Sequence, residues 1–185
     1  MNESNIRRGI CALASIAMFG SAFWVASAHA DGSNRTLVLS VYLDTAGGSN
    51  ALAGDYSAAI EDIESHRPYD NMGALAAETN LCVAYAMTQQ WEAAQAKCDA
   101  AVASARLSDA DDVFDFGAGR NRRLATAYSN RAVLHWLQKR PAKALADLTR
   151  ARSLAPRLEF VSRNWIALNQ EPDSSARPTV ASTQP

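Results

Sequence analysis

A short pattern recurs three times along this chain and constrains its fold more than any other feature. In each copy, two polar or small residues precede an aromatic residue or proline, and alanine follows three positions later. The copies are Gly54-Asp55-Tyr56-x-x-Ala59, Gln89-Gln90-Trp91-x-x-Ala94 and Lys139-Arg140-Pro141-x-x-Ala144. A repeat of this kind predicts stacked helix hairpins, because one hairpin alone cannot bury both of its apolar faces.

Apolar spacing around these copies predicts the helices themselves. Tyr56, Ala59, Ile60 and Ile63 fall at i, i+3, i+4 and i+7, which is one face of a helix that starts at Tyr56. Gly47-Gly48 predicts a break at the end of an extended segment, and residues 108–121 predict a loop. The other predicted helices span residues 73–88, 91–106, 122–138, 141–154 and 157–169.

The two ends of the chain differ from its middle. Residues 1–30 have the features of a signal peptide, with Arg7 and Arg8 before an apolar run and a small-x-small site at Ala28-His29-Ala30. We expect cleavage after Ala30 and a periplasmic or secreted protein, with an uncleaved membrane anchor as the alternative. Residues 31–50 predict an extended N-terminal segment, residues 51–170 the helical domain, and the Pro/Ser/Thr-rich residues 171–185 a disordered tail.

The stretch from Ala125 to Pro156 resembles the tetratricopeptide repeat family. Tyr128 matches the family's first aromatic residue, and Pro156 matches its terminal proline. The small residues at which paired helices touch are matched by Ala132, Ala144 and Ala151. The resemblance covers about two and a half repeats, from Ala51 to Leu168, and implies an all-α fold of antiparallel helix hairpins stacked as a short solenoid.

The resemblance also implies a binding surface. Asn80, Asn130 and Asn164 fall at equivalent places in successive first helices, where the family's peptide-binding members carry an asparagine that reaches the backbone or a carboxylate of the ligand. An amide donates and accepts hydrogen bonds at once, which suits a peptide bond. The alternative is that each asparagine caps or bridges neighbouring helices. The other partner-binding candidates, nearby in phase, are Arg131, Trp136 and Arg163.

Charge is divided unevenly along the mature chain. Residues 31–116 contain 14 acidic and 4 basic residues, whereas residues 117–185 contain 12 basic and 4 acidic ones. This division favours an acidic peptide or a free C-terminal carboxylate as partner, and weak head-to-tail self-association, with contacts that weaken as salt rises. The basic residues lack the interleaved aromatic residues that stack on bases, so no nucleic-acid partner is expected.

Two cysteines remain once the signal peptide is removed. Cys82 and Cys98 lie about eight residues before and after the predicted turn at Gln89-Gln90, so they should sit at similar heights along an antiparallel hairpin. Export places the chain where disulfides persist. We therefore expect a Cys82–Cys98 disulfide, with two buried thiols as the alternative.

No enzyme motif or metal-binding spacing occurs in the sequence. His66 and His135 are far apart and sit at a helix end and at a repeat position, so both are interpreted as structural. We expect an exported protein-interaction scaffold with no cofactor, no metal and no catalytic residue. The alternatives are a membrane-tethered scaffold and a small enzyme with a site assembled from scattered residues.

Overall fold

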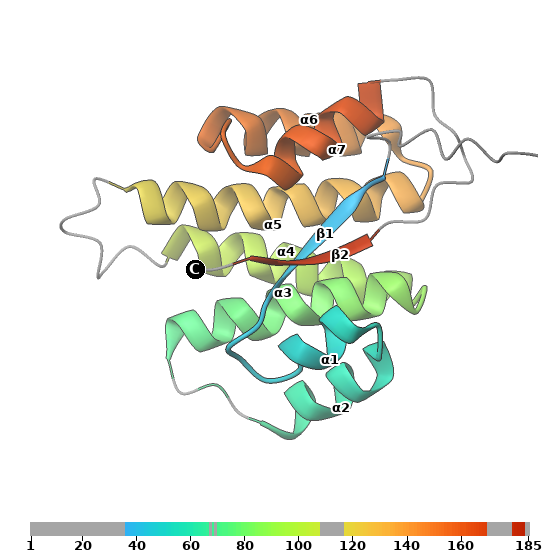
Figure 1. The fold of residues 1–185 in the computed structure, drawn as a ribbon, viewed down its shortest axis with the longest axis vertical. Helices are drawn as coiled ribbons and strands as arrows, with labels where there is room; N and C mark the ends of the chain where they lie inside the picture. Colours follow the sequence, from blue (N-terminus) through green and yellow to red (C-terminus); the bar gives the residue numbers. More distant parts are fainter. Residues whose placement is uncertain (1–35, 67, 69, 108–116, 170–178, 184–185) are drawn as a thin grey trace, which may run out of the picture. The chain divides into compact units, whose positions relative to one another are not determined.

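The computed structural model describes residues 36–66, 68, 70–107, 117–169 and 179–183. The expected signal peptide, most of the loop after residue 107 and the start of the expected tail lie outside the described residues. Helices dominate what is described, and two short strands accompany them (Figure 1). The elements are β1 (Val38–Tyr42), α1 (Gly48–Ala53), α2 (Tyr56–Ser65), α3 (Asn71–Met87), α4 (Trp91–Leu107), α5 (Ala118–Leu137), α6 (Pro141–Leu154), α7 (Glu159–Asn169) and β2 (Thr179–Thr183).

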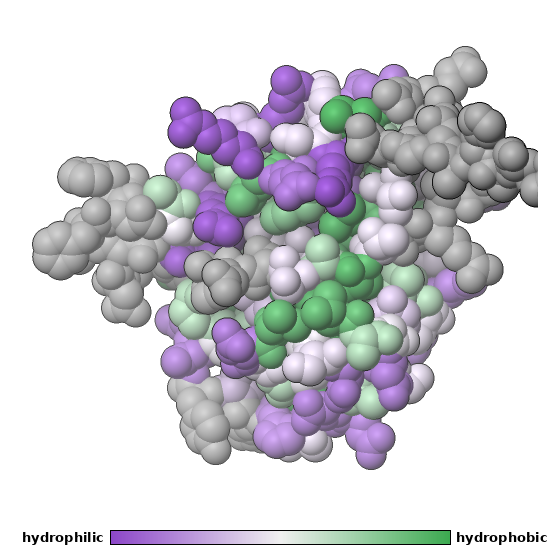
Figure 2. Space-filling model, viewed as in Figure 1, coloured by the Kyte–Doolittle hydropathy of each residue, from purple (hydrophilic) through white to green (hydrophobic). Residues whose placement is uncertain are grey.

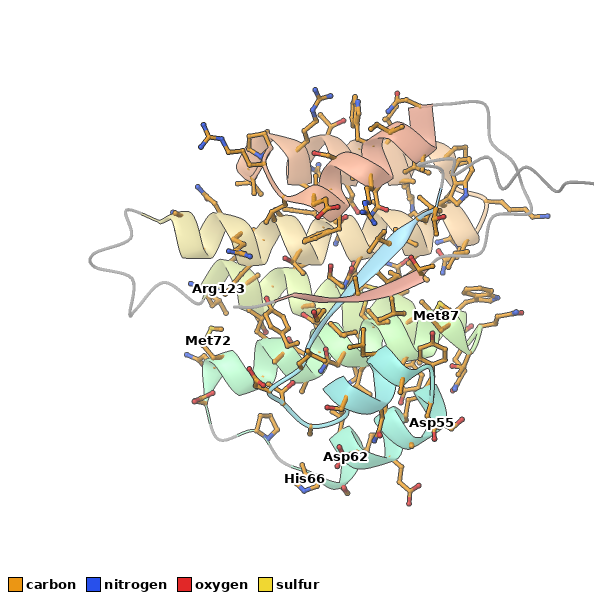
Figure 3. All side chains as sticks on the ribbon, viewed as in Figure 1. Asp55, Asp62, His66, Met72, Met87 and Arg123 are labelled. Atoms are coloured by element: carbon orange, nitrogen blue, oxygen red, sulfur yellow. A yellow bond between two sulfur atoms is a disulfide. The ribbon has the colours of Figure 1, made fainter. Side chains whose placement is uncertain are left out.

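Local signals in the sequence set several of the helix boundaries. Asp55 caps α2 by accepting a hydrogen bond from the Ala58 N–H at 3.1 Å, and Asp70 caps α3 in the same way. Pro141 opens α6, where a missing N–H costs nothing. Figure 3 shows Asp55 at the start of α2, with Asp62 and His66 towards its other end. These starts confirm the predicted boundaries of α2 and α6.

The extended segment does end before Gly47-Gly48, as expected, but these glycines also start a helix, α1, which was not predicted. Gly47 adopts φ 69°, a left-handed conformation that favours glycine, and forms the N-cap. A Cβ on Gly48 would collide with the backbone of Tyr42 and Leu43. The pair therefore lets the chain reverse tightly behind β1. The extended segment predicted for residues 31–50 is confirmed only for β1.

Two hairpins, α3–α4 and α5–α6, close with the same turn. In the first, Gln90 N–H donates to the Tyr85 carbonyl at 2.9 Å and Gln89 adopts φ 61°. In the second, Arg140 N–H donates to the His135 carbonyl at 2.8 Å, and the turn residue has φ 58°. This is the Schellman arrangement, with a left-handed residue just past the helix end. Both predicted hairpins are confirmed, although α5 starts at Ala118 and so takes up the end of the predicted loop.

Small residues let the paired helices pack closely. Ala94, Ala144 and Ala151 are fully buried, as the sequence pattern requires. Cys82 in α3 and Cys98 in α4 face each other with Cα atoms 4.8 Å apart and form a disulfide. The expected disulfide is therefore present in this structure.

The expected disordered tail is partly wrong, because residues 179–183 form β2. This strand pairs with β1 in parallel, and Leu39 lies opposite Val180 in the register. Its Thr and Val residues favour a strand, but a five-residue segment is too short for composition to reveal. Strand β1 contacts α3, α5 and α7, and β2 lies beside it (Figure 1).

Within the described residues, no helix is long and apolar enough to cross a membrane.

Candidate functional site

The three asparagines predicted to bind a partner bind the protein's own backbone in this structure, namely that of β1. Asn164 accepts from the Val38 N–H at 2.7 Å and donates to the Val38 carbonyl at 2.8 Å. Asn130 makes the same two bonds with Ser40, both at 2.8 Å. These pairs place two side-chain amides where a neighbouring strand would otherwise lie.

Asn80 completes the series at the end of β1. It accepts from the Tyr42 N–H at 2.8 Å and donates to the Tyr42 carbonyl at 2.9 Å. Each asparagine comes from a different helix, namely α3, α5 and α7, and each is fully buried. Alternate residues of a strand present their main-chain groups to the same edge. The three bonded residues of β1 are two positions apart, so each helix supplies the amide for one of them. We call Asn80, Asn130 and Asn164 the amide ladder.

The amide ladder recognises main chain without depending on the side chains of β1. Both amide atoms are satisfied at each position, which is the condition for burying a polar group at low cost. The Ser40 hydroxyl, by contrast, has no hydrogen-bond partner among the described residues. These three amides are committed to the protein's own strand in this structure and do not face a partner. Amide side chains do not ionise near neutral pH, so the ladder offers hydrogen bonds and no acid or base.

Strand β1 is buried on both of its faces. Leu37, Leu39 and Val41 pack into an apolar cluster with residues of α1, α2, α3 and α5. Tyr42 packs into a second cluster and is 3% exposed, and burial raises the pKa of its hydroxyl to about 12. The strand is thus an integral part of the core as well as the segment that the amide ladder binds.

Arg131 lies among α4, α5 and α6 rather than beside the amide ladder. Its guanidinium makes two hydrogen bonds to Asp147, at 2.7 and 2.9 Å, and one to Asp99 at 2.8 Å. Hydrogen bonding to Asp147 is the main cause that raises the pKa of Arg131 above its usual value. The ion pairs compensate the charge of a largely buried side chain, and they give Arg131 a structural role.

The two remaining partner-binding candidates are also separate from the ladder's contacts. Trp136 is half-buried against the apolar cluster around β1. Arg163 is exposed and pairs with Glu159 one turn earlier in α7. The structure therefore brings together the three asparagines, but does not add Arg131, Trp136 or Arg163 to their site.

The Asp147 carboxylate centres a group of charges that the sequence did not reveal. It is 3% exposed and contacts Arg131, Arg150 and, at 3.6 Å, the Nε2 atom of His135. Burial lowers the pKa of His135, and the charge of Asp147 opposes this effect. No spacing rule joins residues on different helices, so only the fold could bring this group together. The other described histidine, His66, is exposed, and its ring lies against Asp62 in α2 (Figure 3).

Among the described residues, no group of three His, Cys, Asp or Glu side chains is arranged to hold a metal ion. Comparisons of the chain with protein-family models, with curated proteins and with solved structures give no match.

Proposed function

We propose that this chain is an exported interaction scaffold of the tetratricopeptide type, which binds an extended segment of a partner protein on the face that carries the strands. The amide ladder is the observation that supports the proposal most strongly. It holds an extended backbone through three helices, and this is the mode of recognition expected of a peptide-binding helical repeat. In this protein the ladder holds β1 in place, and β1 in turn offers its main chain for pairing with a further extended segment.

Several features support a non-enzymatic role outside the cytoplasm. The Cys82–Cys98 pair fits an oxidising compartment, and the signal-like first 30 residues fit export. The amide ladder and the main chain of the strands supply hydrogen-bond donors and acceptors, which suit recognition. The basic residues of α5, α6 and α7 favour a partner with acidic residues beside the bound segment.

Site-specific photo-crosslinking in the producing cell tests this function. Leu52→p-benzoylphenylalanine places the probe on α1, which contacts β2, and Leu145→p-benzoylphenylalanine places a matched probe on α6. The two leucines are similarly exposed, at 41% and 42%. We expect adducts with another polypeptide from position 52 and few from position 145. Equal labelling at the two positions, or none at either, would contradict the proposal.

A further inference from the structure

The second edge of β1 is held differently from the first. Val38, Ser40 and Tyr42 turn their main-chain groups towards the amide ladder, so Leu37, Leu39 and Val41 present theirs to the opposite edge. Strand β2 lies on this edge, and the Thr179 N–H donates to the Leu37 carbonyl at 2.7 Å. An extended segment thus binds the protein by main-chain pairing with a strand that the scaffold itself fixes.

The strand on this edge makes few side-chain contacts. Among its described side chains, Val180 packs against the apolar cluster around β1, and the exposed Thr179 donates its hydroxyl to the Leu37 carbonyl at 3.4 Å. Strand β2 carries no charge and no residue larger than valine. Its described side chains make one apolar contact and one long hydrogen bond, whereas three buried amides hold β1, so the pairing of β2 is of a kind that a different segment can replace.

The surroundings of this edge are apolar. Helix α1 contacts both strands, and its Leu52 side chain is 41% exposed. Figure 2 shows hydrophobic surface gathered on this face around the strands and α1, with hydrophilic residues towards its borders. Exposed apolar surface rimmed by polar residues is typical of an interaction site.

We propose that the outer edge of β1 is the partner-binding site, and that β2 is an internal ligand that occupies it until a partner replaces it. The partner segment is extended, runs parallel to β1, and carries a β-branched apolar residue where Val180 lies, with small residues on either side. Main-chain pairing supplies the affinity and the central residue supplies the specificity, as in other strand additions. This inference rests on the proposed function and names the edge and the chemistry of its ligand.

Covalent connection makes β2 a competitor. Nine residues separate Asn169 at the end of α7 from Thr179. A tether of this length gives a bound segment an effective concentration on the order of millimolar. A free peptide of the same sequence must therefore compete at a disadvantage, and weakening β2 should expose the site without altering the scaffold.

A matched pair of proline variants of the full chain tests this. The Thr179 bond and the alternation of a strand place the Ala181 N–H towards β1 and the Ser182 N–H away from it. Ala181→Pro removes a pairing donor, whereas Ser182→Pro removes a donor on the other edge of β2. The probe is a fluorescent peptide with the sequence of residues 176–185, measured by anisotropy.

We expect Ala181→Pro to bind the probe about tenfold or more tightly than the unaltered chain. Ser182→Pro should bind it like the unaltered chain, and a peptide that carries proline in place of Ala181 should not bind. Equal affinity for the two variants would overturn the proposal, as would absence of binding to Ala181→Pro with its circular dichroism unchanged. If the unaltered chain formed dimers that exchange β2 between copies, a second copy would occupy this edge, and the proposal of a different partner would be overturned.

The crosslinking measurement separates this inference from the proposed function. If Ala181→Pro increases the adducts formed from position 52, both stand. If adducts form but Ala181→Pro leaves their yield unchanged, the scaffold function stands and the edge of β1 is not its site. If the peptide binds Ala181→Pro but the cell yields no adducts, the edge binds extended segments and the proposed function fails.

Discussion

Strands β1 and β2 lie side by side, yet the protein holds them by different means. Side-chain amides from three helices clamp one edge of β1, and its side chains fill the core on both faces. Strand β2 pairs along one edge and anchors a single apolar side chain. The comparison teaches that an extended segment can be part of the core or act as a ligand of it. The difference depends on how many of its main-chain groups and side chains the helices bind.

The largest expected effect comes from breaking the middle of the amide ladder. Asn130→Ala leaves the buried N–H and carbonyl of Ser40 without partners, so we expect the free energy of unfolding to fall by about 3–5 kcal/mol in urea denaturation. Ser40→Ala, which keeps the main chain, should change it by less than about 0.5 kcal/mol. Similar losses for the two variants would mean that β1 is not held through its backbone.

Removing the disulfide should have the next largest effect. It closes a loop of 16 residues in sequence separation between α3 and α4, so Cys82→Ala with Cys98→Ala should cost about 3 kcal/mol. Because α3 carries Asn80, amide exchange should increase at Tyr42 more than at Val38. Mass spectrometry of the unreduced protein gives the direct check, and two alkylatable thiols after denaturation would contradict the disulfide.

Acid should weaken the helical frame before it affects β2. Burial lowers the pKa of His135 below 6.5, so the unfolded chain takes up a proton more readily than the folded protein. Stability from this group is full above the unfolded pKa and declines as the pH falls below about 6.5. We expect the thermal midpoint to fall between pH 7.5 and 5.5, and to fall less in His135→Gln. An equal fall in both proteins would exclude His135 as the cause.

The smallest effect on stability should come from β2. Because β2 buries one apolar side chain, we expect Ala181→Pro to lower the free energy of unfolding by no more than about 1 kcal/mol. Ser182→Pro provides the matched control. A loss as large as that of Asn130→Ala would show that β2 belongs to the core, and the distinction between the two strands would fail.

The sequence predicted the helices better than it predicted the strands. Apolar periodicity and start signals such as Asp55 and Pro141 act locally, so they predicted the start of α2 and both ends of α6 to the residue. Spacing also placed Cys82 opposite Cys98. In contrast, β2 depends on an edge supplied by a segment more than a hundred residues away, and its own five residues carry little signal.

The candidate site was predicted in its chemistry but not in its ligand. The resemblance singled out Asn80, Asn130 and Asn164 as amides that bind a partner, and the structure shows all three on the backbone of the protein's own β1. That the backbone is the chain's own could not be predicted, because the choice depends on where β1 packs. Arg131 was misplaced for a related reason, since its partners Asp99 and Asp147 lie on other helices.

Amide hydrogen exchange along β1, resolved by residue, tests the central claim most directly. In the unaltered chain, all five amides of β1 should be protected, because the ladder and β2 satisfy alternate ones. In Ala181→Pro, we predict fast exchange at Leu39 and Val41, with Val38, Ser40 and Tyr42 still protected, and no change in Ser182→Pro. Loss of protection at all five amides together, or at none, would contradict the account.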